Sequence, residues 1–306
     1  SMIYGSGLPY RYTLGPVLAS MGARACVYGV TGNSPVDYLA TLKYVAKRID
    51  AGAHVAFYLY AYNDFVSLNK YFRRGFLSLS NRFAMISRWL SYFDRWRRTT
   101  FTRSLFRAGV VVQPSTTLWQ YDVGTSEPIR LLYPRDPANY VAPPPLNKQQ
   151  RAALKFFFDK VAEFARGRSW HLSIVIHPDH PEIYANFARR SPVFVDLDPR
   201  RADGLQICNE YSFVCEDISP YLYERSVAEG KNPYFINDRH FSVFGTRIVA
   251  EHYLLLTKRV VKSARQLGWQ ENATDIEAVV AAQRPAFSEP NQYRRNQKPA
   301  SDRSPS

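Results

Sequence analysis

Cysteine is scarce in this sequence, and the cysteines that occur do not form a metal-binding pattern. Cys26, Cys208 and Cys215 lack the close paired spacing of thiolate zinc sites. Cys208 and Cys215 are near enough in the sequence to form a disulfide, but two buried thiols fit the sequence equally well. The sequence therefore argues against a cysteine-rich metal centre and leaves the redox compartment open.

A long apolar run is also missing. No stretch of about 18 apolar residues occurs, so no segment of the sequence is expected to cross a bilayer as a helix. No signal-peptide pattern is visible either. The chain opens at Ser1-Met2 rather than at an initiator methionine and soon enters sequence typical of a folded domain. We expect a targeting or anchoring segment upstream in the natural protein, and an extracytoplasmic location, either periplasmic or membrane-anchored.

Acidic residues are almost absent from one part of the chain. The 306 residues include 40 Lys and Arg against 26 Asp and Glu, which gives a net charge of +14. Between Val66 and Arg107, Asp94 is the single acid among ten basic residues. Aromatic and aliphatic side chains recur in this stretch every three or four positions, with arginines between them. This spacing predicts a basic amphipathic helical insertion over residues 65–107.

Three interpretations of the 65–107 insertion remain open. As a membrane-surface element, it would place aromatic side chains at the headgroup boundary and arginines on lipid phosphates. As a lid, it would pack its apolar stripe against its own domain. Nucleic-acid binding requires aromatic and basic residues on one exposed face, and here the two kinds separate. Contact with a membrane surface through residues 65–107 is therefore among the expected interactions, and no nucleic-acid partner is expected.

The rest of the chain is rich enough in apolar residues, 46%, to bury a large core. Short apolar runs alternate with helical patterns, which favours a three-layer α/β/α sandwich with a mostly parallel sheet. We place this domain at residues 1–261 and expect residues 262–306 to be a largely disordered extension. The predicted strands are Ala25–Tyr28, His54–Tyr60, Val110–Val112, His171–Ile176, Val193–Leu197 and Tyr211–Cys215; the predicted helices are Arg11–Met21, Val36–Ile49, Asn147–Arg166 and Phe244–Val261.

The stretch from Asn237 to Gly245 contains a candidate acid/base pair. Asp238 lies two residues before His240 in a loop that feeds the last predicted helix. A carboxylate can fix the tautomer of a nearby imidazole while the other ring nitrogen faces a nucleophile. By itself, such a pair in a polar turn is more often a solvated cap. The pair becomes more informative beside Gly32 and Asn63. Both of these residues follow predicted strands, and sites in parallel sheets lie at the carboxyl ends of strands.

At these positions the chain resembles the GDSL/SGNH hydrolases. Gly29 to Ser34 resembles the glycine block of that family, Tyr60 to Asp64 its asparagine block, and Asp238 to His240 with Gly245 its last block. The blocks occur in the family's order, and the resemblance covers roughly Ser1 to Val261. It implies a flavodoxin-like α/β/α sandwich and a serine hydrolase or acyltransferase.

The chain departs from the family pattern in three places. Tyr60 and Tyr62 stand where glycines are common, and Asp238 lies two rather than three residues before the histidine. No Gly-Asp-Ser nucleophile motif occurs. The opening Ser1-Met2-Ile3-Tyr4-Gly5 matches that motif from its serine onward, which makes Ser1 the candidate nucleophile. The alternatives are Ser6 and a chain without a nucleophile, since a Ser-Met start could also come from cloning.

The resemblance implies acyl transfer through a serine ester. His240 would take the proton of Ser1, Asp238 would orient the imidazole, and the Gly32 amide with the Asn63 side chain would form the oxyanion hole. The expected substrate is an acylated glycan or lipid, with no cofactor and no metal. His177 and His180 are not expected to hold a metal, because no third ligand is suitably spaced. The alternative is a catalytically degenerate module that binds a membrane or a polysaccharide-export partner through the basic insertion.

Overall fold

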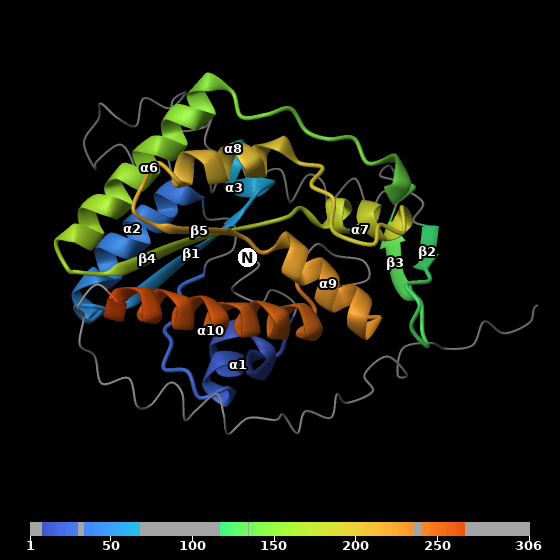
Figure 1. Ribbon diagram of the computed structural model, residues 1–306, viewed down its shortest axis with the longest axis horizontal. Coiled ribbons are helices and arrows are strands. Elements are labelled where there is room, and N and C mark those ends of the chain that lie inside the picture. The colour runs from blue at the N-terminus through green and yellow to red at the C-terminus, as the bar shows by residue number, and fades with distance from the viewer. Residues whose placement is uncertain (1–7, 30–33, 68–116, 134, 236–239, 267–306) are drawn as a thin grey trace, which may run out of the picture.

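The computed structural model of the protein describes residues 8–29, 34–67, 117–133, 135–235 and 240–266 (Figure 1). Within this part of the chain the protein has a mixed α/β fold. Three parallel strands form a sheet in the order β1-β4-β5, and helices lie on both of its faces (Figure 1). The strands are β1 (His54–Tyr60), β4 (His171–His177) and β5 (Val214–Asp217).

The central strand, β4, is apolar along most of its length because it is buried on both faces. It pairs with β1 from His54 opposite His171 to Tyr60 opposite His177. On its other edge it pairs with the shorter β5. The three strands therefore end together, and their carboxyl ends form one edge of the sheet.

Two apolar cores lie on the two faces of the sheet. One face is covered by α2, α6 and α8, and the other by α1, α9 and α10 (Figure 1). A two-stranded antiparallel hairpin, β2 and β3, lies beyond the sheet near α7. The helices are α1 (Leu14–Ser20), α2 (Pro35–Val45), α3 (Asn63–Ser67), α6 (Lys148–Arg166), α7 (His180–Ala188), α8 (Pro199–Cys208), α9 (Ser219–Glu229) and α10 (Val243–Gln266); the hairpin strands are β2 (Thr117–Tyr121) and β3 (Ile129–Tyr133), and short 3-10 turns lie at Tyr10–Tyr12, Ala46–Arg48 and Pro137–Asn139.

Helix α6 shows how local signals place these elements. The side chain of Asn147 accepts a hydrogen bond from the Gln150 amide at 2.9 Å, and the Gln150 side chain accepts one from the Asn147 amide at 3.0 Å. This reciprocal cap fixes the start of the helix. Leu154, Phe157 and Val161 then recur at helical spacing and are fully buried against the sheet.

The predicted strand His54–Tyr60 is confirmed at both ends, and His171–Ile176 is confirmed with one further residue. The predicted strand Tyr211–Cys215 lies about three residues too early, because β5 begins at Val214. The helix predicted at Phe244–Val261 begins at Val243 and continues to Gln266, beyond the expected domain boundary. Helix α1 is shorter than the predicted Arg11–Met21, and α2 is shorter than the predicted Val36–Ile49.

Two strand predictions are wrong. Ala25–Tyr28 is extended but has no hydrogen-bonded neighbour strand among the described residues. Val193–Leu197 is also not a strand, because side chains bind its backbone. The Asn186 amide group pairs with both the N–H and the C=O of Val195, and Glu182 accepts the Leu197 amide at 2.7 Å. The predicted strand Val110–Val112, residues 68–107 of the predicted insertion and the tail from residue 267 lie outside the described residues.

Cys208 and Cys215 form a disulfide, which decides between the two states that the sequence left open. The bond joins the last residue of α8 to β5. Cys26 is a free thiol in the extended segment before α2.

Candidate active site

Polar side chains gather at the carboxyl end of the sheet, beyond Tyr60 of β1 and His177 of β4. The Tyr60 hydroxyl donates a hydrogen bond to the carboxylate of Asp179, which follows β4. The same carboxylate lies 3.0 Å from Nδ1 of His180, the first residue of α7. Tyr60, Asp179 and His180 are all buried. The structure thus brings a tyrosine, a carboxylate and an imidazole into one hydrogen-bonded group.

Asp64 lies one turn after β1, in the short helix α3, and is buried. Its carboxylate accepts the Tyr60 amide at 2.7 Å and the Tyr38 hydroxyl at 3.1 Å. Burial raises the pKa of the Asp64 carboxyl to about 7, although these two hydrogen bonds act in the opposite direction. Near neutral pH this group is therefore poised between its protonated and ionised forms.

His177 is the last residue of β4, and its ring is packed between the rings of two neighbours. It stacks on Tyr60 at a centroid distance of 4.7 Å and meets Phe241 at 5.6 Å. Burial lowers the pKa of His177 to about 3, against the hydrogen-bonding effect of the Pro178 carbonyl. The ring is therefore neutral at pH 7 and acts as an apolar spacer between the end of β1 and the loop before α10.

The loop before α10 is held in place by backbone contacts on both sides of His240. Tyr234 and Phe241 form an antiparallel bridge, and the His240 carbonyl accepts the Phe235 amide at 3.0 Å. Gly245 is required at the base of this loop, because a Cβ there would lie 1.9 Å from the Pro233 carbonyl oxygen. These contacts fix the backbone of His240, which is half-buried, beside Tyr234 and Phe235.

These contacts bring two of the predicted blocks together. The end of β1, which starts the asparagine block, touches His177, and His177 touches Phe241, the neighbour of His240. Asn63 is the first residue of α3, directly beyond the end of β1; its side chain lies outside what the structure describes. Ser1, Ser6, Gly32 and Asp238 also lie outside the described residues.

The Asp179–His180 pair is a potential functional group that the sequence reasoning missed. From the sequence, His180 is notable only as a candidate metal ligand, and Asp179 has no predicted role. The signal was present, since both residues directly follow a strongly predicted strand. No group of three or more histidine, cysteine or acidic side chains is placed to hold a metal ion within the described ranges.

A second buried polar cluster holds α7, α8 and the start of α9 together. Arg201 is fully buried and contacts both carboxylate oxygens of Glu182, at 2.7 and 2.9 Å. It also donates to Ser219 at 2.7 Å and to Asp196. Bidentate pairing of this kind fixes geometry as well as charge. The cluster therefore positions the elements behind the site.

Comparison of the chain with protein-family models, curated proteins and solved structures finds no match. In the part of the chain that the structure describes, no helix combines the length and the apolar character needed to cross a membrane.

Proposed function

We propose that the protein is a serine hydrolase of the SGNH type, an esterase or O-acyltransferase. The observation that carries this proposal is the meeting of the asparagine block and the His240 loop through His177 at the carboxyl end of a parallel sheet. Residues far apart in the sequence are brought to one edge, which is where parallel α/β sheets carry their sites. The family resemblance in the sequence supplies the type of chemistry.

In this proposal, His240 accepts the proton of the Ser1 hydroxyl as that oxygen attacks an ester carbonyl. Asp238 orients the imidazole and compensates its positive charge. The Gly32 amide and the Asn63 side chain donate to the developing oxyanion, where the loss of one donor typically costs about 3 kcal/mol of barrier stabilisation. The alcohol leaves with the proton from His240, and water or a sugar hydroxyl then resolves the acyl-enzyme.

An acylated glycan or lipid outside the cytoplasm is the proposed substrate class. The Cys208–Cys215 disulfide supports the compartment, because disulfides persist in oxidising surroundings. The basic insertion supports contact with an anionic surface, because it starts at the end of α3, next to the site. A negatively charged surface would therefore be held close to the proposed centre.

The test is labelling with a fluorophosphonate probe, read by intact mass. We expect a single adduct that is lost in Ser1→Ala and strongly reduced in His240→Ala. His180→Ala is the matched control, because His180 also lies at the carboxyl end of the sheet and pairs with the carboxylate of Asp179. Loss of the adduct in His180→Ala with full labelling of His240→Ala would assign the base to the Asp179–His180 pair and reject the proposed triad.

A non-catalytic, SGNH-like binding module is the second candidate, and the position of Tyr60 favours it. Tyr60 stands where the family often has glycine, and its buried ring is held by Asp179 and His177. A tyrosine fixed in this way narrows the space for an ester at the end of β1. A folded protein that takes up no probe but binds anionic vesicles would favour this candidate.

A further inference from the structure

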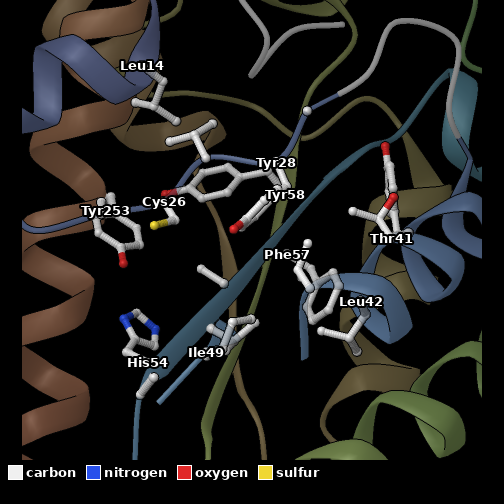
Figure 2. Close-up of a pocket in the computed structure, with 18 of the residues that line it drawn as sticks. Leu14, Cys26, Tyr28, Thr41, Leu42, Ile49, His54, Phe57, Tyr58 and Tyr253 are labelled. Atoms are coloured by element: carbon white, nitrogen blue, oxygen red, sulfur yellow. The ribbon is translucent and has the colours of Figure 1, made fainter. Parts of the chain in front are cut away.

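A cavity of about 330 Å³ runs along the edge of β1 that does not pair with β4. Figure 2 shows His54, Phe57 and Tyr58 of β1 on one side of it and Cys26 and Tyr28 of the extended segment on the other. Protein interiors contain few voids larger than a water molecule, which needs only about 10–15 Å³. The cavity therefore has room for a further piece of polypeptide.

The walls of the cavity come from both helical layers. Leu14 and Leu18 of α1 line it from one face of the sheet, and Leu42 and Val45 of α2 line it from the other. The cavity thus lies in the plane of the sheet, between two apolar layers. An occupant that fits this position is an extended strand with apolar side chains on both faces.

The backbone of β1 has unused hydrogen-bonding groups on this edge. Ala53 accepts from His171 and Ala61 donates to His177, so the odd-numbered residues of β1 face β4. Because parallel strands bond alternate residues to each side, His54, Ala56 and Tyr58 face the cavity. Their N–H and C=O groups have no hydrogen-bond partner among the described residues. The Tyr58 hydroxyl is also buried, and it has no hydrogen-bond partner in the part of the chain that the structure describes. These three residues are only half-buried, and a row of unpaired backbone groups on a strand edge is a template for pairing with a further strand, so this edge can accept one.

The placement of α1 shows which part of the chain belongs in the cavity. Crossover connections between parallel strands are right-handed. Helices of crossovers that run in the same direction across the sheet therefore pack on the same face, and helices of crossovers that run in the other direction pack on the other face. Helices α2, α6 and α8 precede β1, β4 and β5 in turn and share a face (Figure 1). Helix α1 leads into Ala25–Tyr28 from the opposite face. The crossover through α1 therefore runs across the sheet in the opposite direction, away from β1. It must start from a strand that lies between Ala25–Tyr28 and β1.

We propose that this cavity is the seat of a parallel strand formed by the residues directly upstream of Ser1 in the natural protein. The strand would pair with β1 on one side and with Ala25–Tyr28 on the other. If the strands are numbered along the chain, with the proposed strand as the first, their order across the sheet would be 2-1-3-4-5, which is a doubly wound order. The inference does not depend on ester chemistry, because a non-catalytic protein would need the same strand.

The experiment compares this chain with one extended upstream by about ten residues of its natural reading frame. A second extended protein, with two apolar residues of the extension changed to aspartate, is the control. Residue-resolved hydrogen exchange of Ala56 and Tyr58 amides is measured against that of Val55 and Phe57, which already face β4. Alkylation of Cys26, the free thiol on the cavity wall, gives an independent readout.

The expected natural extension contains about four to six consecutive apolar residues. In the shorter chain we expect Ala56 and Tyr58 to exchange at least about tenfold faster than Val55 and Phe57. In the extended protein this difference should close, Cys26 should alkylate at least about tenfold more slowly, and Tm should rise by roughly 10 °C. The aspartate control should behave like the shorter chain. A polar or proline-rich upstream sequence, or an unchanged exchange ratio in a folded extended protein, would overturn the proposal.

Discussion

At the scale of single residues, the end of β1 is organised by Asp64. This carboxylate accepts a hydrogen bond from the amide of Tyr60, the last residue of the strand, and another from the hydroxyl of Tyr38 in α2. An aspartate in the first turn of a helix is a common stabilising feature. Here its burial makes it a pH-dependent one as well.

Asp64→Asn should change how stability depends on pH. The folded-state pKa of about 7 lies above the ordinary 3.8, so the folded protein holds an extra proton between these values. The free energy of unfolding of the natural protein therefore falls as pH rises through this window, by up to about 4 kcal/mol. Asparagine does not ionise, so burying it has no pH-dependent cost. The free energy of unfolding of both proteins is measured by urea denaturation at pH 5 and at pH 8. The value for Asp64→Asn minus that for the natural protein should be larger at pH 8 than at pH 5. An equal difference at the two pH values would contradict the prediction.

Gly245→Ala should destabilise the loop that carries His240. The added Cβ would meet the Pro233 carbonyl, which is backbone and cannot swing away. We expect a loss of about 2–3 kcal/mol in the free energy of unfolding, as for other overpacked sites. Gly167→Ala is the matched control, because a Cβ there meets its nearest neighbour at an ordinary 3.8 Å. If both variants unfold at the same urea concentration, the close approach at Gly245 carries no energetic cost.

At the scale of secondary-structure elements, the sequence predicted those parts whose signals are local. The run at His54–Tyr60 is rich in aromatic and branched residues, and α6 has both a cap and a regular apolar stripe. Ala25–Tyr28 looks similar to a strand in composition, but a strand also needs a neighbour. Helix α8 was not predicted, because its Gly204 and its charged residues obscure the apolar spacing.

The site was predictable to a similar degree. The sequence predicted that the loop before the last helix and the end of β1 would lie at one edge of a parallel sheet. The structure shows Phe241, the neighbour of His240, against His177, which stacks on Tyr60. It did not indicate that Asp179 and His180 would join them, because their pairing depends on how Tyr60 and α7 pack. Contacts of this kind are tertiary and leave no periodic pattern.

The disulfide between α8 and β5 should contribute measurably to stability. Cys208 and Cys215 are 7 residues apart, and closing so short a loop lowers the entropy of the unfolded chain by an amount worth about 2–3 kcal/mol. Replacing both cysteines by serine should lower the free energy of unfolding by about this much. Cys26→Ser, which removes only the free thiol, should leave it unchanged within about 0.5 kcal/mol. Equal stability of the two variants would show that the bond is dispensable.

At the scale of the whole molecule, the excess positive charge should govern binding to surfaces. Vesicle sedimentation should show binding to anionic lipid that weakens with salt, and none to neutral lipid. At about 1 kcal/mol per basic residue, reversing three of them in the insertion should weaken binding roughly 100-fold or more. The two proteins to compare carry the same net charge. One carries Arg95→Glu, Arg97→Glu and Arg98→Glu in the insertion; the control carries Lys43→Glu in α2, Lys47→Glu in the 3-10 turn after it and Lys148→Glu in α6, all at exposed positions.

Equal weakening in both charge-reversed proteins would mean that net charge, rather than the insertion, drives attraction to the surface. Unchanged binding in both would remove the membrane-surface interpretation of residues 65–107.

The pairing of β1 with β4 also affects how the protein is made. These neighbouring strands are separated by more than a third of the chain, so a ribosome releases β1 well before its partner exists. At typical synthesis rates the wait is about ten seconds, during which an apolar strand with open edges is exposed. Sheets that join distant segments also fold slowly. Yield of soluble protein should therefore depend on chaperones and on slow, cool expression more than the stability of the finished fold would suggest.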